Sequence, residues 1–141
     1  VTIPGAVAAW TTLNEKYGQL ELGQILAPAI KAAEDGYRIT PRVAHDWELY
    51  KGRVAGHPAA AARFLPNGKA PRTGDRMDNP ELGATLRAIA THGASAFYTG
   101  AIAEEIVTTL RALGGTHSMD DFADYEIIET LPIGADYRDH M

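Results

Sequence analysis

QLELGQILAPAIKAAEDGY, residues 19–37, is the stretch that decides the fold. Its apolar residues recur every three or four positions, which is the spacing of one face of an α-helix. They are Leu22, Ile25, Leu26, Ala29, Ile30 and Ala33. Lys31, Glu34 and Asp35 lie off that face, on the side expected to meet solvent. The pattern predicts an amphipathic helix that buries one apolar stripe.

The two ends and the middle of this helix carry specific signals. Gly36 follows the last periodic residue, where a left-handed C-cap is favoured. Pro28 lies inside the pattern, where it removes a backbone donor and crowds the carbonyl four residues earlier. We therefore expect a helix over residues 19–36 that is kinked or divided in two at Pro28.

Two further helices begin with a capping residue followed by proline, at Thr40-Pro41 and Asn79-Pro80. The first has a stripe of Val43, Trp47 and Tyr50, and Gly52 is expected to end it. The second places Leu82, Leu86, Ile89 and Ala90 on one face and is expected to end at His92-Gly93.

Two amphipathic helices are expected outside this central part. One begins at Pro4-Gly5, carries Val7, Trp10, Thr11 and Leu13, and ends near Tyr17-Gly18. The other runs from Gly100 to Gly114-Gly115, with its stripe formed by Ile102, Ile106, Val107, Leu110 and Leu113.

Residues 53–77 are broken repeatedly by proline and glycine and predict a surface loop with local structure. Ala59 to Ala62 with Phe64 favour two helical turns after Pro58. Asn67-Gly68 indicates a tight turn, either alone or as the turn of a hairpin between residues 63–65 and 69–71. Ser95 is expected to cap a short turn carrying Phe97 and Tyr98, and Ser118 with Asp121 resembles a capping box.

The period changes near the C-terminal end of the sequence. Residues 125–130 alternate in a β-branched-rich run, and residues 135–138 form a second possible strand. The predicted fold class is therefore mainly α, with five to seven helices ending in a short β-ribbon. Such a hairpin is marginal unless it joins a sheet, which this sequence does not supply.

Composition bounds the classes of function. A chain of 141 residues fits one domain and is long enough to bury a core without the help of disulfides. Disulfides are excluded, because the sequence contains no cysteine. The net charge of −5 and the single, scattered Lys and Arg residues argue against nucleic acid as a partner. No apolar run reaches the length of a membrane span. The missing initiator Met and the abrupt ends suggest a piece of a longer protein.

The search for chemistry predicts no catalytic, cofactor-binding or metal-binding residue. The histidines His45, His57, His92, His117 and His140 lack ligand spacing, so solvated or hydrogen-bonded imidazoles are favoured over a metal site. The acidic pairs Glu34-Asp35, Glu104-Glu105 and Asp120-Asp121 split across helix faces, which favours solvated or capping roles over general acid and base catalysis.

Nucleophiles and ligand loops are also absent from the patterns. No G-x-S-x-G elbow surrounds Ser95 or Ser118, and both serines stand where a cap is wanted. Thr11-Thr12 and Thr108-Thr109 lie within predicted helices. Gly114-Gly115 closes a helix, so a C-cap is favoured over a phosphate or oxyanion loop. Trp10, Trp47, Phe64, Phe97 and Tyr98 are interpreted as core anchors, because no basic residues interleave with them.

Six blocks of sequence, taken together, resemble the large subunit of the gamma-glutamyltranspeptidase (glutathione hydrolase) family. They cover nearly the whole chain in the family's order. The blocks are Ile3-Pro4-Gly5-Ala6-Val7-Ala8-Ala9-Trp10 with Lys16-Tyr17-Gly18; Leu26-Ala27-Pro28-Ala29-Ile30 with Ala33 and Gly36-Tyr37; Gly74-Asp75, Asn79-Pro80 and Leu82 with Thr85-Leu86-Arg87 and Ile89-Ala90; Phe97-Tyr98, Gly100, Ile102-Ala103 and Ile106; Gly114-Gly115, Asp121-Phe122-Ala123 and Tyr125; and Pro132-Ile133 with Tyr137-Arg138. Ala9 stands where the family commonly has glycine, and Gly83 where it commonly has alanine.

The resemblance implies the helical portion of an αββα N-terminal nucleophile hydrolase, made as a precursor that cleaves itself into two subunits. It implies that residues 1–141 are one helical segment of the large subunit and that residues 125–138 begin its core sheet. Gamma-glutamyl amides such as glutathione would be cleaved by an N-terminal threonine outside this chain, so the fragment alone is expected to be inactive.

The partners implied by the resemblance are the small subunit of the same precursor and a gamma-glutamyl substrate, with no cofactor. A periplasmic or extracellular location is suspected from the family. The fragment could also associate with itself through an apolar surface or through the edge of residues 125–131. Two alternatives remain open: a non-catalytic helical interaction module, and a fragment of a related cephalosporin-type acylase.

Overall fold

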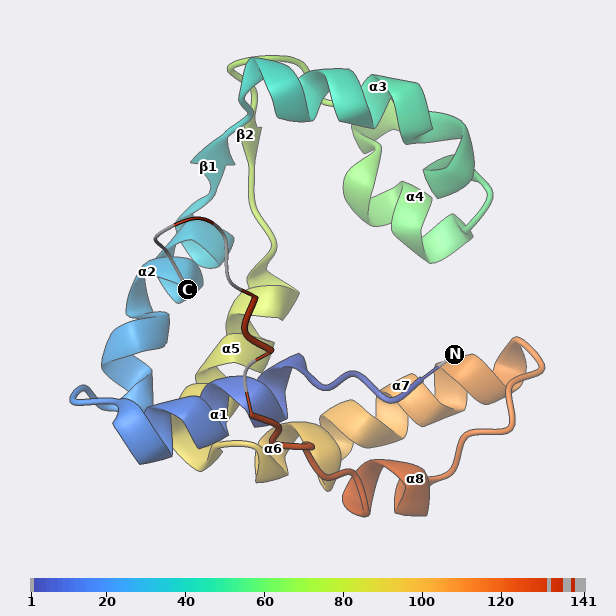
Figure 1. Cartoon of the computed structure of the whole chain (residues 1–141). Coiled ribbons are helices and arrows are strands. Elements are labelled where there is room, and N and C mark those ends of the chain that lie inside the picture. Colours follow the sequence, from blue (N-terminus) through green and yellow to red (C-terminus); the bar gives the residue numbers. More distant parts are fainter. Residues whose placement is uncertain (1, 132, 136–137, 139–141) are drawn as a thin grey trace. The chain divides into compact units, whose positions relative to one another are not determined.

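The computed structural model describes residues 2–131, 133–135 and 138. It is mostly helical, with two short strands, and the chain folds into two compact units (Figure 1). Unit 1 comprises residues 1–21 and 92–141, and unit 2 comprises residues 22–91. No helix in the described part of the chain is both long and apolar enough to cross a bilayer.

Unit 1 contains α1 (Ala6–Tyr17), α6 (Ser95–Tyr98), α7 (Ala101–Ala112) and α8 (Met119–Ala123). The limits of α1 and α7 agree with the sequence-based expectations. Phe122 and Ala103 are fully inaccessible to solvent at the centre of this unit. The other buried residues are Val7, Thr11, Tyr98 and Val107.

The capping box before α8 is present as predicted. The Ser118 hydroxyl accepts the Asp121 backbone N–H at 3.2 Å, and the Asp121 carboxylate accepts the Ser118 N–H at 2.7 Å. Gly114 has φ of +88°, and the N–H groups of Gly114 and Gly115 donate to the carbonyls of Arg111 and Leu110. These bonds form a Schellman motif, so the glycine pair closes α7 as expected.

Unit 2 contains α2 (Leu22–Asp35), β1 (Tyr37–Arg38), α3 (Pro41–Ala55), α4 (Pro58–Phe64), a 3₁₀ turn (Pro66–Gly68), β2 (Arg76–Met77) and α5 (Pro80–His92). The antiparallel β1 and β2 pair Tyr37 with Met77 and Arg38 with Arg76. These strands were not predicted, because two residues carry no detectable alternation. They hold α3 and α4 at the far end of a narrow ribbon (Figure 1). The buried apolar residues of this unit are Leu26, Ile30, Ala33, Ile39, Leu65, Leu86 and Ile89.

The decisive helix α2 forms, with three corrections. It begins at Leu22 and runs to Asp35 as one helix with Pro28 inside it, so the division expected at Pro28 is wrong, and the alternative of a kink there stays a prediction. Of the predicted stripe only its central row is buried, and Ile25 at the edge is 45% exposed. Gly36 has φ of +80°, which confirms the left-handed cap.

The caps of α3 and α5 are confirmed. The Thr40 hydroxyl accepts the Val43 N–H, and the Asn79 side chain accepts the Leu82 N–H at 3.1 Å. Gly52, however, does not end α3, which continues to Ala55. An interior glycine costs a helix only about 1 kcal/mol, so flanking residues can carry the helix through it.

Three smaller expectations are wrong for local reasons. Residues 63–64 belong to α4, so they cannot form one arm of a hairpin across Asn67-Gly68. Ser95 does not cap α6, because Ala94 is already helical, and the Ser95 hydroxyl donates to the His92 carbonyl at 2.8 Å. Trp10 is 45% exposed and is not a core anchor.

The predicted β-ribbon is the largest discrepancy. Residues 125–131 form no strand, and the second predicted strand, residues 135–138, lies partly outside the described residues. Ile128 and Leu131 are 89% and 90% exposed. A strand makes its hydrogen bonds to a neighbouring strand, and the described residues supply none here.

Candidate functional site

A cluster of aromatic side chains joins distant parts of unit 1. The buried Tyr98 hydroxyl donates to the Pro4 carbonyl at 2.6 Å and accepts the Ala8 N–H at 3.2 Å. The Tyr98 ring stacks on Tyr125 at 5.4 Å between centroids and meets Phe97 edge-on at 5.0 Å. Burial raises the pKa of Tyr98, so its hydroxyl stays protonated and able to donate.

Gly5 is required at this cluster by steric contact. A Cβ atom at Gly5 would overlap the Tyr125 hydroxyl, although the backbone φ of Gly5 is an ordinary −96°. Tyr125 is also the first residue of the segment 125–131, which forms neither helix nor strand. The cluster therefore fixes the start of this segment against α1 and α6, and it is a structural clamp with no exposed reactive group.

A bidentate ion pair holds α2 against α5 in unit 2. Arg87 donates from Nε and Nη2 to the two carboxylate oxygens of Glu34, both at 2.6 Å. The hydrogen bonds from Arg87 lower the pKa of Glu34. Gly83 lies directly beneath, where an added Cβ would come within 2.6 Å of the Glu34 Cγ atom. Glu34 was expected to point into solvent but is half-buried and paired.

The groove beside this ion pair has a volume of about 510 Å³. It is lined by Gly23, Ala27, Ile30, Lys31, Glu34, Asp35, Arg87, Ala90 and Thr91. Lys31 pairs with Asp35, and Arg87 with Glu34, so its charged groups already satisfy one another. The groove thus offers no uncompensated charge to a ligand.

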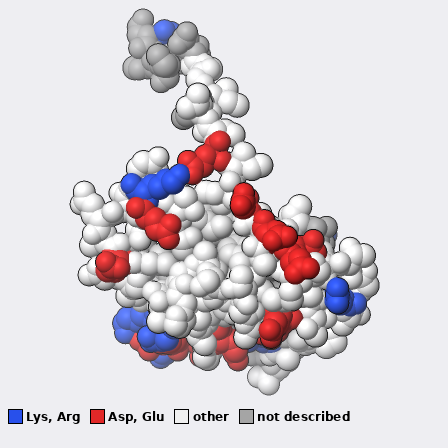
Figure 2. Space-filling view, turned by 90° about the horizontal axis from the view of Figure 1, so that it is seen from below, with Lys and Arg blue, Asp and Glu red and all other residues white. Residues whose placement is uncertain are grey.

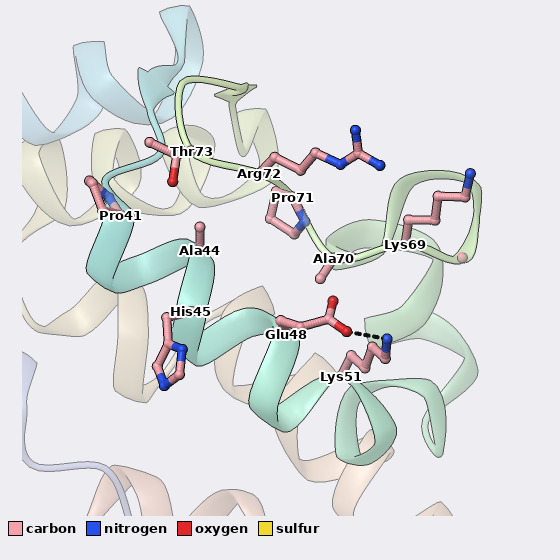
Figure 3. Close-up of a pocket in the computed structure, with 11 residues that line it drawn as sticks. Pro41, Ala44, His45, Glu48, Lys51, Lys69, Ala70, Pro71, Arg72 and Thr73 are labelled. Atoms are coloured by element: carbon pink, nitrogen blue, oxygen red, sulfur yellow. Dashed lines mark hydrogen bonds and ion pairs between the residues drawn. The ribbon is translucent and has the colours of Figure 1, made fainter.

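A second groove, of about 600 Å³, lies between α3 and residues 68–73 (Figure 3). Glu48 points toward this loop and pairs with Lys51 on the same helix. The Lys69 and Arg72 side chains extend away from α3, and the His45 ring points away from the loop. No nucleophile and base converge in this groove.

The histidines lie apart in the described structure. His57 accepts the Ala60 N–H as the cap of α4, and the His117 carbonyl accepts Arg111 Nε at 2.7 Å. His45 lines the groove of Figure 3, His92 ends α5, and His140 lies outside the described residues. Among the described residues, no group of three or more His, Asp or Glu side chains is arranged to hold a metal ion.

The two members of an acidic pair were expected to lie on different helix faces, and the pair Glu34-Asp35 does bind different partners. Glu34 binds Arg87 on α5, whereas Asp35 binds Lys31 on its own helix. Asp121 caps α8, and the backbone hydrogen bond from Ser118 lowers its pKa. The Thr11 hydroxyl donates to the Val7 carbonyl at 3.1 Å, which is a structural role.

Residues from three of the sequence blocks, at positions 3–10, 97–98 and 125, are in contact in the Tyr98 cluster. A model of the gamma-glutamyltranspeptidase family matches residues 1–141. The chain belongs to the gamma-glutamyltranspeptidase family. A glutathione hydrolase proenzyme of Escherichia coli (strain K12) is 34% identical over 139 residues, covering 98% of this chain and 24% of the relative.

Solved structures of the gamma-glutamyltranspeptidase family and its neighbours agree. The Helicobacter pylori gamma-glutamyltranspeptidase matches with a TM-score of 0.93 and 33% identity, covering 96% of this chain and 39% of that one. A cephalosporin acylase from Bacillus halodurans matches with a TM-score of 0.91 and 38% identity, covering 98% and 27%. The chain spans about a quarter of the length of the curated relatives it matches.

Sequence reasoning missed both tertiary contacts that organise these regions. Glu34 and Arg87 are 53 positions apart, and Tyr98 and Tyr125 are 27 apart, so no local periodicity connects them. The available signal was the family resemblance itself, whose blocks include six residues of the Tyr98 cluster: Pro4, Gly5, Ala8, Phe97, Tyr98 and Tyr125. Gly83 provides the space that Glu34 occupies.

Proposed function

We propose that this chain is a supporting part of a gamma-glutamyltranspeptidase large subunit. The whole enzyme would cleave gamma-glutamyl amides such as glutathione, using an N-terminal threonine that lies outside these residues. The match over residues 1–141 together with the quarter-length coverage of curated relatives supports this proposal. Family membership alone carries the reaction type.

The supporting role is argued from the hydroxyl groups of the chain, which form hydrogen bonds within the chain itself. Tyr98, Ser118 and Thr11 all make short-range or backbone hydrogen bonds that hold helices together. Acyl transfer through a hydroxyl nucleophile requires a base within hydrogen-bond reach of that hydroxyl. In the proposed enzyme the threonine's own amine is that base, and water or an amino acid or peptide acceptor takes the acyl group.

The proposed architecture is the helical cover of an αββα sandwich, with the segment after Tyr125 forming a core strand beside the rest of the precursor. The alternating pattern of residues 125–130 and the exposure of Ile128 and Leu131 support this placement. Outward apolar side chains on a segment with unpaired backbone groups are stabilised by joining a sheet. The partner in this proposal is the remainder of the same precursor.

The test compares the 141-residue chain with the longer precursor that would contain it. The isolated chain is expected not to release aniline from a gamma-glutamyl anilide, whereas the precursor is expected to do so after self-cleavage. A precursor whose first small-subunit residue is changed from threonine to alanine is the control for cleavage. Turnover by the 141 residues alone would overturn the proposal.

A second candidate reaction is cleavage of a cephalosporin-type amide, favoured by the 38% identity to the Bacillus halodurans acylase. We expect the residues that choose between the two substrates to lie outside this chain. Assaying the processed precursor on both substrates separates them. A precursor that turns over neither would support the remaining alternative, a helical interaction module without activity.

A further inference from the structure

Charge is divided very unevenly along this acidic chain. Residues 38–76 contain eight Lys and Arg against three Asp and Glu, a net charge of +5. The remaining residues contain five Lys and Arg against fifteen Asp and Glu, a net charge of −10. We call residues 38–76 the basic lobe. A whole-chain charge of −5 conceals this separation.

The basic lobe lies within unit 2 and consists mainly of α3, α4 and the loop that follows them, carried on β1 and β2 (Figure 1). Lys69 and Arg72 are exposed, and their side chains extend away from α3 (Figure 3). In the described part of the chain, no carboxylate lies within ion-pair distance of either side chain. Their charge is therefore presented outward.

An oppositely charged surface belongs to unit 1. This unit has three Lys and Arg against eleven Asp and Glu, a net charge of −8. Acidic residues spread over the face seen from below (Figure 2). We define the acidic surface by exposed carboxylates of α7, of α8 and of the segment just after it: Glu104, Glu105, Asp120, Asp124 and Glu126.

We propose that the basic lobe is an interaction surface for a second copy of this chain, whose acidic surface it contacts. The argument is charge complementarity, because one molecule carries both a +5 lobe and a −8 unit. The two surfaces differ, so the contact is heterologous, joining the lobe of one copy to unit 1 of the next. This inference does not rest on the proposed function.

Salt dependence distinguishes this contact from apolar association. The Debye length is about 30 Å at 0.01 M salt and about 3 Å at 1 M, so attraction between exposed charged surfaces weakens steeply over that range. Complementary charge mainly increases the association rate and fixes how the two partners are oriented. Association through the exposed apolar residues of the C-terminal segment would instead persist or strengthen at high salt.

The test uses three double variants whose charge changes are equal in magnitude. Lys69→Glu with Arg72→Glu alters the lobe, and Asp124→Lys with Glu126→Lys alters the acidic surface. Lys16→Glu with Lys31→Glu is the control, since it changes exposed cations outside the lobe. Circular dichroism establishes that each variant keeps the helical content of the wild type.

Sedimentation velocity then measures association at about 0.01 M and 0.3 M salt. We expect the wild type and the control to form concentration-dependent oligomers at low salt that dissociate at high salt. Each of the other two variants is expected to self-associate about tenfold more weakly. Mixing these two variants restores association, because the lobe variant retains its acidic surface and its partner retains the lobe.

Four outcomes would overturn the proposal. The first is a wild type that sediments as a monomer at every concentration in low salt, and the second is a wild type that associates equally in both salt conditions. The third is a mixture of the two variants that fails to associate although both are folded. Finally, binding of the basic lobe to anionic lipid vesicles or to DNA, with no self-association, would assign this surface to a different class of partner.

Discussion

Helix α2 and the segment of residues 125–131 had equally clear sequence patterns and reached opposite outcomes. The apolar spacing of three and four produced a continuous helix from Leu22 to Asp35. The alternating pattern after Tyr125 produced an extended segment without a ladder, in which Ile128 is 89% exposed. One pattern is realised within the chain and the other is not.

The difference lies in where each element finds its hydrogen bonds. A helix pairs its backbone groups within the same segment and needs only one face covered by neighbours. A strand forms its backbone hydrogen bonds with a neighbouring strand. A segment with a strand-like sequence therefore forms no strand when that neighbour is absent. We therefore propose that the segment after Tyr125 has the sequence of a strand and that residues outside this chain would supply its sheet.

The largest expected effect comes from truncating matched isoleucines in the two regions. Ile30 is 6% exposed in α2, so Ile30→Ala is expected to reduce the free energy of unfolding by about 2–5 kcal/mol. Ile128→Ala is expected to change it by less than about 0.5 kcal/mol in the isolated chain. Urea unfolding followed by circular dichroism measures both. An equal loss for both variants would mean that residues 125–131 are packed.

A smaller effect is expected at the point where the C-terminal segment is anchored. In Gly5→Ala the new methyl group overlaps the Tyr125 hydroxyl, and overpacking of this kind typically costs about 1–3 kcal/mol. Adding Tyr125→Phe removes the clashing oxygen and should recover part of the loss. Thermal unfolding of the single and double variants measures this.

The matched control for that substitution is Gly52→Ala within α3. Gly52 has no atom within 4 Å of an added Cβ, so the change should stabilise the helix by about 0.5–1 kcal/mol. If Gly5→Ala were as benign as this control, the clamp around Tyr98 and Tyr125 would not hold the segment as described.

The smallest effect concerns the ion pair that seats α2 on α5. Arg87 lowers the pKa of Glu34 below its ordinary value of 4.5, so the ionised carboxylate stabilises the fold above that pH. This contribution is lost as the pH falls through the lowered pKa. The stability difference between wild type and Glu34→Gln should therefore be present at pH 7 and vanish in acid. A difference independent of pH would show that the ion pair does not contribute.

Local signals predicted most of the fold and none of its long-range contacts. The caps at Thr40, Asn79 and Ser118 and the glycines at 36 and 114 set helix ends correctly, because capping depends on neighbouring residues only. The two-residue strands β1 and β2 gave no pattern to detect. Gly52 was misread because a glycine weakens a helix without having to end it.

The candidate sites were harder to predict than the helices. No reactive arrangement is predicted from the sequence, and no sequence pattern indicates the stacking of Tyr98 on Tyr125 or the Glu34–Arg87 pair. Such pairs depend on how helices pack, which periodicity does not specify. The family resemblance identified several of these residues without indicating that they touch.

We propose that this chain is a helical support and that the segment after Tyr125 becomes a strand only in the precursor. The most direct test is hydrogen exchange of the backbone amides of residues 126–131. We predict unprotected exchange in the 141-residue chain, beside strong protection in α2, and protection of the same six amides once they are joined to the rest of the precursor. Equal protection of residues 126–131 in both molecules, or none in the precursor, would contradict the account.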